Sequence, residues 1–286
     1  MTTATKKARA TAGLMFIIAT LSLAQANAKP TLPANTQDNT SSTTASELYR
    51  LGNLEMTKGN YDLAISNFDK VIALASSSVD AFMARGNAYY QKNDYDHALV
   101  DFNHALELSP QSAMIYSLRG NLNISKRDLD SAVSDLTQAI KLDPQLPQVF
   151  TSRGLAYSDR GDGDLAIHDF DQAIKLNSSD SIAYFGRGTA YAGNKDFDRS
   201  IADYSRAIEL NPQYAHAFRN RGFVYALKGD YSRALSDVSQ SISLAPEAET
   251  FMTRAVIYKE KGDMDKATAD YNQAIKLDPA LANIPQ

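Results

Sequence analysis

Residues 79–112 read VDAFMARGNAYYQKNDYDHALVDFNHALELSPQS. In the first half of this stretch, Phe82, Gly86 and Tyr89 stand at helical spacing and share one face of a helix. In the second half, small and apolar residues between Ala98 and Leu106 form a similar stripe. A polar turn separates the halves, and a proline near the end stops the second one, because proline cannot continue a helix. The stretch therefore predicts two antiparallel helices joined by a tight turn.

The same pattern recurs in phase along most of the 286-residue chain. Glycine returns every 34 residues from Gly52 to Gly222, and Ala255 takes its place in a last copy that starts one residue early. Glycine at position 8 and alanine at positions 20 and 27 allow the helix backbones to approach closely. Counted from Ala45 as position 1, the predicted repeats are seven: 45–78, 79–112, 113–146, 147–180, 181–214, 215–247 and 248–281.

Each repeat resembles the tetratricopeptide repeat, which carries a bulky residue at position 4, Gly or Ala at 8, Tyr at 11, Ala at 20, an aromatic at 24, Ala at 27 and Pro at 32. The departures are local, such as Ser76 and Ser178 in place of the closing proline and Ser200 in place of an alanine. The resemblance implies an all-α fold, an α-solenoid of antiparallel helix pairs. The fifth repeat matches through Tyr184, Gly188, Tyr191, Tyr204, Ala207 and Pro212.

Residues 1–28 read as a secretory signal peptide. Lys6, Lys7 and Arg9 precede an apolar run, and Ala26-Asn27-Ala28 resembles a cleavage site. The alternative is a transmembrane anchor, but the apolar stretch 10–24 is broken by polar residues and is short of a span of roughly 20 residues. We therefore expect cleavage after Ala28 and no stable membrane insertion. A bacterial periplasmic location is the expectation, and secretion is the alternative.

The segments flanking the repeats are short. Residues 29–44 hold two prolines and many Ser, Thr and Asn, so we expect a flexible linker there, and 282–286 form a C-terminal tail. The chain has no cysteine, which excludes disulfides and a thiol-linked lipid anchor. Loss of the three basic residues in 1–28 takes the formal net charge from −4 to −7. Without concentrated positive charge, nucleic acid is not an expected partner.

Arginine at position 7 and aspartate at position 23 occur together in the same repeats. Position 7 is arginine and position 23 is aspartate in six repeats, whereas the first repeat has Leu51 and Asn67. Both positions lie eight residues from the turn, so the two side chains face each other at one height, and their pairing satisfies two partly buried charges. An arginine ladder for an anionic polymer is the alternative. The predicted pairs are Arg85–Asp101, Arg119–Asp135, Arg153–Asp169, Arg187–Asp203, Arg221–Asp237 and Arg254–Asp270.

The resemblance also implies that positions 2, 5, 9 and 12 of each first helix line a concave groove. Three successive asparagines occupy position 9, and an amide both donates and accepts hydrogen bonds, which suits an extended peptide backbone. The alternative for these asparagines is a solvated surface role. The candidate groove residues are Tyr49, Asn53, Met56, Met83, Asn87, Tyr90, Asn121, Phe185, Arg219 and Phe223.

Catalytic and cofactor motifs are absent from the sequence. The four histidines lie scattered over different repeats, no GxSxG setting occurs, and the GDGD at 161–164 lacks the glutamate of a calcium loop. We therefore expect no enzyme activity, no cofactor and no metal. The function predicted is an exported protein-interaction scaffold that binds an extended peptide or a partner helix. The alternatives are a structural homo-oligomer, starting from a homodimer through the array ends, and a glycan binder or enzyme accessory.

Overall fold

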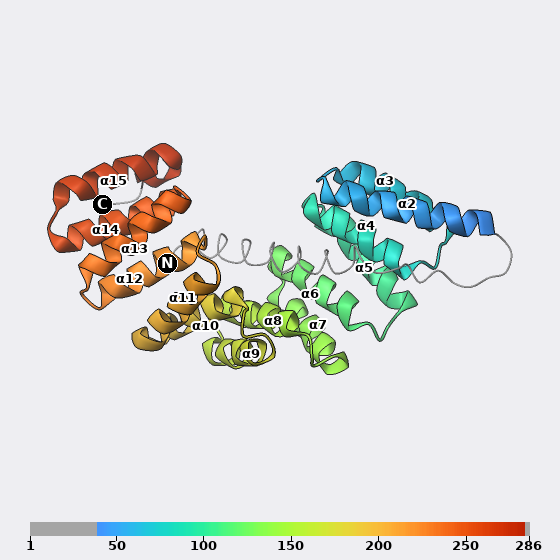
Figure 1. The fold of residues 1–286 in the computed structure, drawn as a ribbon, viewed down its shortest axis with the longest axis horizontal. Helices are drawn as coiled ribbons and strands as arrows, with labels where there is room; N and C mark the ends of the chain where they lie inside the picture. The colour runs from blue at the N-terminus through green and yellow to red at the C-terminus, as the bar shows by residue number, and fades with distance from the viewer. Residues whose placement is uncertain (1–38, 284–286) are drawn as a thin grey trace. The chain divides into compact units, whose positions relative to one another are not determined.

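The computed structural model describes residues 39–283, which form fourteen α-helices in consecutive pairs, one 3-10 helix and no strand (Figure 1). This is the all-α fold that the repeats predicted. The helices are α2 Asn39–Thr57, α3 Tyr61–Leu74, α4 Val79–Gln91, α5 Tyr95–Leu108, α6 Ala113–Lys126, α7 Leu129–Leu142, α8 Pro147–Arg160, α9 Gly163–Leu176, α10 Ser181–Gly193, α11 Phe197–Leu210, α12 Ala215–Leu227, α13 Tyr231–Leu244, α14 Ala248–Lys261, α15 Met264–Leu277 and η1 Pro279–Asn283.

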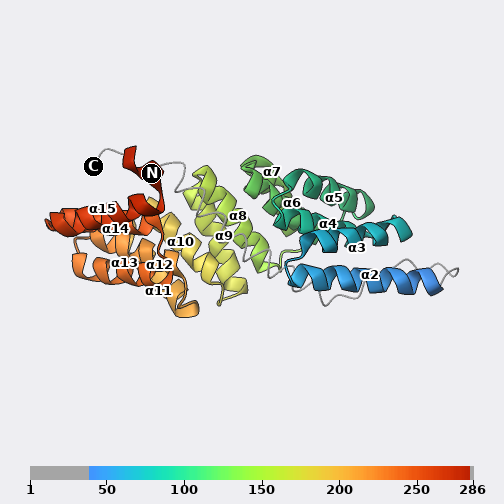
Figure 2. The same cartoon turned by 90° about the horizontal axis from the view of Figure 1, so that it is seen from above.

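The described residues divide into two compact units whose boundary falls inside α8. In the N-terminal unit, 39–156, each of the first helices α2, α4 and α6 packs on the second helix that follows it. In the C-terminal unit, 157–283, α10, α12 and α14 pack in the same way on α11, α13 and α15. The antiparallel pairs are visible from above in Figure 2. Between residues 39 and 283, no helix is both long and apolar enough to cross a bilayer.

The ends of the array differ from the sequence prediction. The predicted signal peptide and residues 29–38 of the predicted linker lie outside the described residues. The helix α2 begins at Asn39, so 39–44 are helical where a flexible linker was expected. Pro33 is the last proline before this point, and no glycine intervenes, so nothing in the sequence stops the helix from extending toward Asn39. At the other end, η1 packs against α15 and takes up two residues of the predicted tail.

Aspartate side chains start most of the second helices. Asp94, for example, accepts a hydrogen bond from the backbone N–H of His97, and Asp128 does the same for Ser131. Such caps satisfy backbone donors that have no partner inside the helix. The residue before each cap has a positive φ, and at Arg127 and Lys195 this left-handed conformation is held by a residue other than glycine. The turn between the paired helices is therefore short and fixed in direction.

Close approach of the paired helices depends on the small residue at position 8. A Cβ added at Gly86 would lie 2.7 Å from the ring of Phe102, which is 1% exposed. At Gly222 it would lie 2.8 Å from Cγ2 of Val238 and 2.9 Å from the backbone oxygen of Ala234. The side chain at position 24 therefore fills the space that the glycine leaves. The hydrophobic core lies between the helices of each pair and continues into neighbouring pairs within a unit.

We expect Gly222→Leu to lower the free energy of unfolding by about 3 kcal/mol, because the new side chain meets the α13 backbone as well as Val238. Gly193→Leu is the matched control, since Gly193 is also helical and no atom lies within 4 Å of an added Cβ. Urea unfolding followed by circular dichroism measures both. Equal stability of the two variants would contradict the close approach.

Candidate functional site

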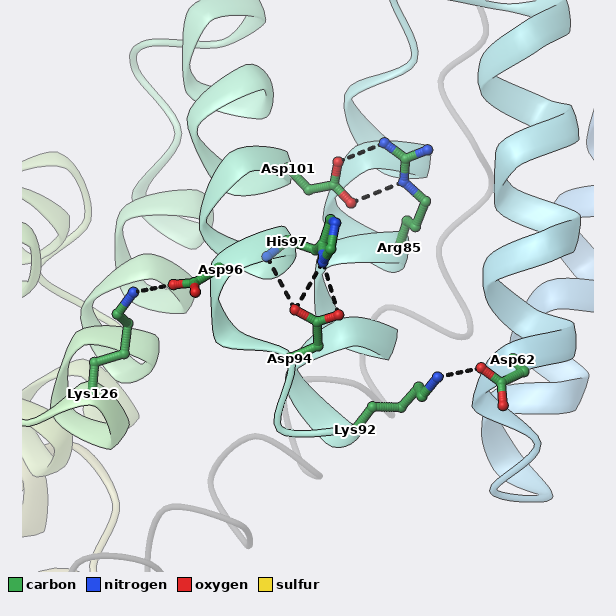
Figure 3. Close-up of polar contacts among 8 residues, drawn as sticks. All are labelled: Asp62, Arg85, Lys92, Asp94, Asp96, His97, Asp101 and Lys126. Atoms are coloured by element: carbon green, nitrogen blue, oxygen red, sulfur yellow. Dashed lines mark hydrogen bonds and ion pairs between the residues drawn. The ribbon is translucent and has the colours of Figure 1, made fainter.

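Arginine at position 7 forms a two-point contact with aspartate at position 23 of the same helix pair. Arg85 donates from Nε and Nη2 to the two carboxylate oxygens of Asp101 at 2.9 and 2.7 Å (Figure 3). Four further predicted pairs have the same geometry, with distances between 2.7 and 2.9 Å: Arg119–Asp135, Arg187–Asp203, Arg221–Asp237 and Arg254–Asp270. Arg153 and Asp169 fall in different units, so their pairing stays a prediction.

The third arginine nitrogen, Nη1, reaches the second helix of the preceding pair. Arg85 Nη1 donates to Asp69 at 2.6 Å, and Arg119 Nη1 donates to Asn103 at 2.7 Å. The acceptor always stands at position 25, which the sequence analysis did not single out. The sequence does carry a pattern that could have predicted this acceptor, because position 25 is polar in each repeat that precedes a repeat with arginine at position 7. The remaining acceptors are Thr137, Asp171, Ser205 and Ser239.

These arginines are partly enclosed and carry their charge at any ordinary pH. The guanidinium of Arg187 lies 5.5 Å from the ring centroid of Tyr184, and four other position-7 arginines lie 5.6–5.7 Å from a position-4 ring. The hydrogen bond to Asp203 raises the pKa of Arg187 further. Burial raises the pKa of Asp101, against the opposite effect of Arg85. The occupied carboxylates favour a structural role for these arginines over a cationic ladder for an anionic polymer.

A second row of contacts joins the turns. Lys126 at position 14 donates to Asp96, at position 18 of the preceding repeat, at 2.6 Å, and Lys92 pairs with Asp62 in the same way (Figure 3). In the C-terminal unit, Lys228 pairs with Asp198. Where asparagine replaces lysine, Asn194 donates to Asp164 at 3.1 Å. All of these contacts are exposed, so each adds only about 0–1 kcal/mol.

The candidate binding surface is the first-helix face, defined by positions 2, 5, 9 and 12 of each first helix. In the N-terminal unit, Tyr49 and Tyr90 are buried, and burial raises the pKa of both to about 12. The Tyr90 hydroxyl lies 2.6 Å from Oγ of Ser125 and so connects α4 with α6. Asn87 is also buried. Three candidates remain half-buried on this face: Asn53, Met56 and Met83.

Asn121 on α6 has an unusual environment. Its side chain is 0% exposed, and neither the amide nitrogen nor the amide oxygen has a hydrogen-bond partner in the described part of the chain. Ser117, one helical turn earlier, is also buried, and its hydroxyl group has no hydrogen-bond partner in the described part of the chain. Buried polar groups normally find partners, and each one left without costs about 1–3 kcal/mol. The centre of the N-terminal first-helix face therefore holds unused hydrogen-bonding capacity.

The C-terminal unit presents a different first-helix face. Phe185 is buried between the rings of Tyr204 and Tyr214, at 5.6 and 4.9 Å between centroids, and so belongs to the core. Arg219 is 4% exposed and donates from Nη1 to Glu249 at 2.9 Å. Phe223 is 39% exposed. Val256 occupies the equivalent position in the next pair and is 41% exposed, so this unit offers apolar side chains at position 9.

The described residues contain no group of three or more His, Cys, Asp or Glu side chains that could hold a metal ion. His97 contacts its own helix cap, Asp94, and stacks on Tyr89 at 5.0 Å between ring centroids. His104 lies against Glu107 and the ring of Phe82. The arrangement supports binding through hydrogen bonds and apolar contact.

Tetratricopeptide-repeat family models match the chain along most of its length. One of them, described as Tetratricopeptide repeat, matches 151–215 and 187–249, and another, described as TPR repeat, matches 52–92 and 86–126. Two further Tetratricopeptide repeat models match 114–146 and 248–281. Among curated proteins, no sequence match is found.

Solved structures with similar folds cover most of the described chain. A tetratricopeptide repeat protein from Parabacteroides merdae is 18% identical with a TM-score of 0.68, over 84% of this chain and 96% of its own. PilF of Pseudomonas aeruginosa is 18% identical with a TM-score of 0.66, over 78% and 98%. YrrB, described as a TPR protein with an unusual peptide-binding site, is 24% identical with a TM-score of 0.52, over 64% of this chain and 94% of its own.

We expect Arg187→Ala to lower the free energy of unfolding by about 3 kcal/mol, because Asp203 stays 6% exposed without a partner. Arg199→Ala is the control, since the Arg199–Asp196 pair is exposed and we expect a loss of under about 0.5 kcal/mol. Thermal and urea unfolding measure both. Unchanged stability of Arg187→Ala, together with lost binding of a partner, would instead favour a binding role for the arginines.

Proposed function

We propose that this chain, built from tetratricopeptide repeats, is an exported, non-enzymatic scaffold that holds an extended segment or helix of a partner protein against the first-helix face of a seven-repeat array. The same fold carries a peptide-binding site in YrrB. Stacked helix pairs give a continuous surface, and such a surface needs only complementary polar and apolar groups to hold a polypeptide. Fold alone does not identify the partner, so the side chains of this face decide what it can bind.

The observation that carries the proposal is the unpaired amide of Asn121. A peptide backbone offers one N–H donor and one C=O acceptor per residue, which are the partners that an asparagine amide lacks. Asn53 and Asn87 stand at the same position in the two preceding first helices. Asn53 is half-buried, whereas Asn87 and Asn121 are buried, so an extended segment along α2, α4 and α6 would pair with the last two amides only where those side chains turn toward it. Such backbone pairing does not require one particular sequence.

The C-terminal first-helix face adds apolar contact. Phe223 and Val256 are both exposed on neighbouring first helices, α12 and α14, which contact each other. Apolar side chains exposed in register on adjacent helices lose water when a partner covers them, at about 25 cal/mol per Å² of apolar area. The C-terminal unit by itself therefore suits an apolar segment of a partner.

We expect Asn121→Ala to weaken partner binding while raising the free energy of unfolding by about 1 kcal/mol, because it removes a buried amide that lacks a partner. The matched control is Asn123→Ala on the same helix. Asn123 donates to Asp135 at 3.2 Å, so its loss lowers stability and leaves binding unchanged. Partners are captured from an envelope extract by chemical crosslinking and quantified for each variant.

Full binding by Asn121→Ala, and by a variant with all three position-9 asparagines changed to alanine, would contradict the proposal. Light scattering over a range of concentrations is the accompanying control. Met264 and Leu277 on the last helix are 55% and 47% exposed, which favours the second candidate function, a structural homo-oligomer built through the array ends. A mass that rises with concentration, with no partner captured, would support that function instead.

Export gives a separate prediction. We expect the chain expressed with its own N-terminus in a Gram-negative host to be recovered from the periplasm with Lys29 as its first residue, because a small-residue site precedes it. N-terminal sequencing and intact mass measure this outcome. Deletion of residues 6–9, which removes the basic residues, should leave the chain in the cytoplasm. Recovery of uncleaved chain in the membrane fraction would favour an anchor.

A further inference from the structure

The last junction between helix pairs departs from the row of turn contacts. At four other junctions, a side chain at position 14 pairs with an aspartate at position 18 of the preceding repeat. At the junction between α12–α13 and α14–α15, the lysine is retained as Lys261 but the aspartate is replaced by Ser232. Within the described chain, no acidic side chain lies in ion-pair distance of Lys261. The replacement therefore leaves one exposed ammonium group without the partner that its equivalents have.

This junction also holds an open cleft of about 750 Å³, formed entirely by residues of the C-terminal unit. Lys261 and Ser232 both line it, together with Tyr225 and Tyr231. The unpaired lysine thus faces a space bordered by a hydroxyl group and by rings, not a flat stretch of surface. Such a space has room for a side chain of another molecule.

The other charged groups that line the cleft neutralise one another. Lys228 pairs with Asp198, and Arg233 pairs with Asp230 while its guanidinium lies 4.4 Å from the ring centroid of Tyr225. Lys261 also attracts Asp263 and helps to lower its pKa, but Asp263 forms its ion pair with Lys266, so Lys261 keeps no ion pair of its own, in a chain whose net charge is negative. The group that complements it is an anion whose size matches the missing aspartate side chain.

We infer that this cleft binds an acidic side chain of a partner polypeptide, whose carboxylate takes the place beside Lys261 that aspartate holds at the other junctions. The inference rests on the proposed scaffold function and locates a contact outside the first-helix face. Tyr225 is 9% exposed and its ring is covered by Arg233, so Tyr231 and the exposed stem of Lys261 are the groups that accommodate an apolar residue next to the acid, because aromatic rings and methylene groups pack against apolar side chains. A segment that pairs an acidic with an apolar residue fits the cleft.

The test is selection of a display library of random linear heptapeptides on the purified exported chain, followed by fluorescence anisotropy with the enriched peptides. We expect the enriched peptides to contain Asp or Glu. Changing that residue to Asn or Gln should raise Kd at least about tenfold, and Ser232→Asp, which rebuilds the partner of Lys261, should do the same. Ser232→Asp restores a pair present at the other turns, so it keeps the fold, and Lys261→Met checks the charge independently.

The control for the cleft is Asp96→Ser, which leaves Lys126 unpaired at a turn of the N-terminal unit. It should gain no peptide affinity, and a gain equal to the wild-type site would mean that an unpaired lysine suffices without the cleft. Unchanged affinity in Ser232→Asp overturns the inference. If Asn121→Ala alone abolishes binding, the cleft is excluded and the scaffold function stands. If no peptide binds any variant, both proposals fail. If acetate displaced the labelled peptide as strongly as unlabelled peptide does, the cleft would be a site for free anions and the inference would be wrong.

Discussion

The three-point contact of the position-7 arginine is the interaction on which the array depends. In Arg187, Nε and Nη2 donate to Asp203 on the second helix of the same pair, and Nη1 donates to Asp171 on the second helix of the preceding pair. One side chain therefore fixes both the pairing within a repeat and the stacking between repeats. A repeat array is stabilised by neighbour contacts alone, so a polar connection repeated at each junction sets the spacing that the first-helix face inherits. The cost of enclosing these charges is offset because both nitrogens of the fork are matched by carboxylate oxygens in the pairs of Arg85, Arg119, Arg187, Arg221 and Arg254.

Much of the fold follows from the 34-residue period, and the reasons are local. Gly86, Phe102 and the capping Asp94 each have a role within one helix pair, so a single repeat of sequence contains the information. The facing of positions 7 and 23 follows from equal distance to the turn. The position-25 acceptors were harder to identify, since contact between repeats depends on how pairs stack, which no single repeat specifies. The start of α2 at Asn39 was missed because polar composition describes solubility and does not stop a helix.

The candidate site was less predictable than the fold, because burial on the first-helix face changes along the chain while the sequence positions do not. Position 5 is Tyr49 in the first repeat, Phe185 in the fifth and Arg219 in the sixth, and all three are buried for different reasons. Phe185 packs on Tyr204 and Tyr214, whereas Arg219 pairs with Glu247 and Glu249 at the start of the next first helix, α14. The neighbours that decide accessibility come from adjacent repeats, so residue type at one position is a weak guide to exposure.

Repetition also supplies an internal reference, because each repeat shows what its position requires for structure alone. At position 14, the turn lysines pair with Asp62 and Asp96 of the preceding repeats. Stability is therefore enough to explain why lysine recurs at this position. Asn121 and Ser232 are departures from that reference: the first keeps the residue type of its row but has an unpaired amide, and the second removes a partner while its lysine is retained. Neither improves packing or pairing within the chain. A polar group that has no use in folding is where recognition of another molecule is best sought, since binding can supply the interaction that folding leaves unmade.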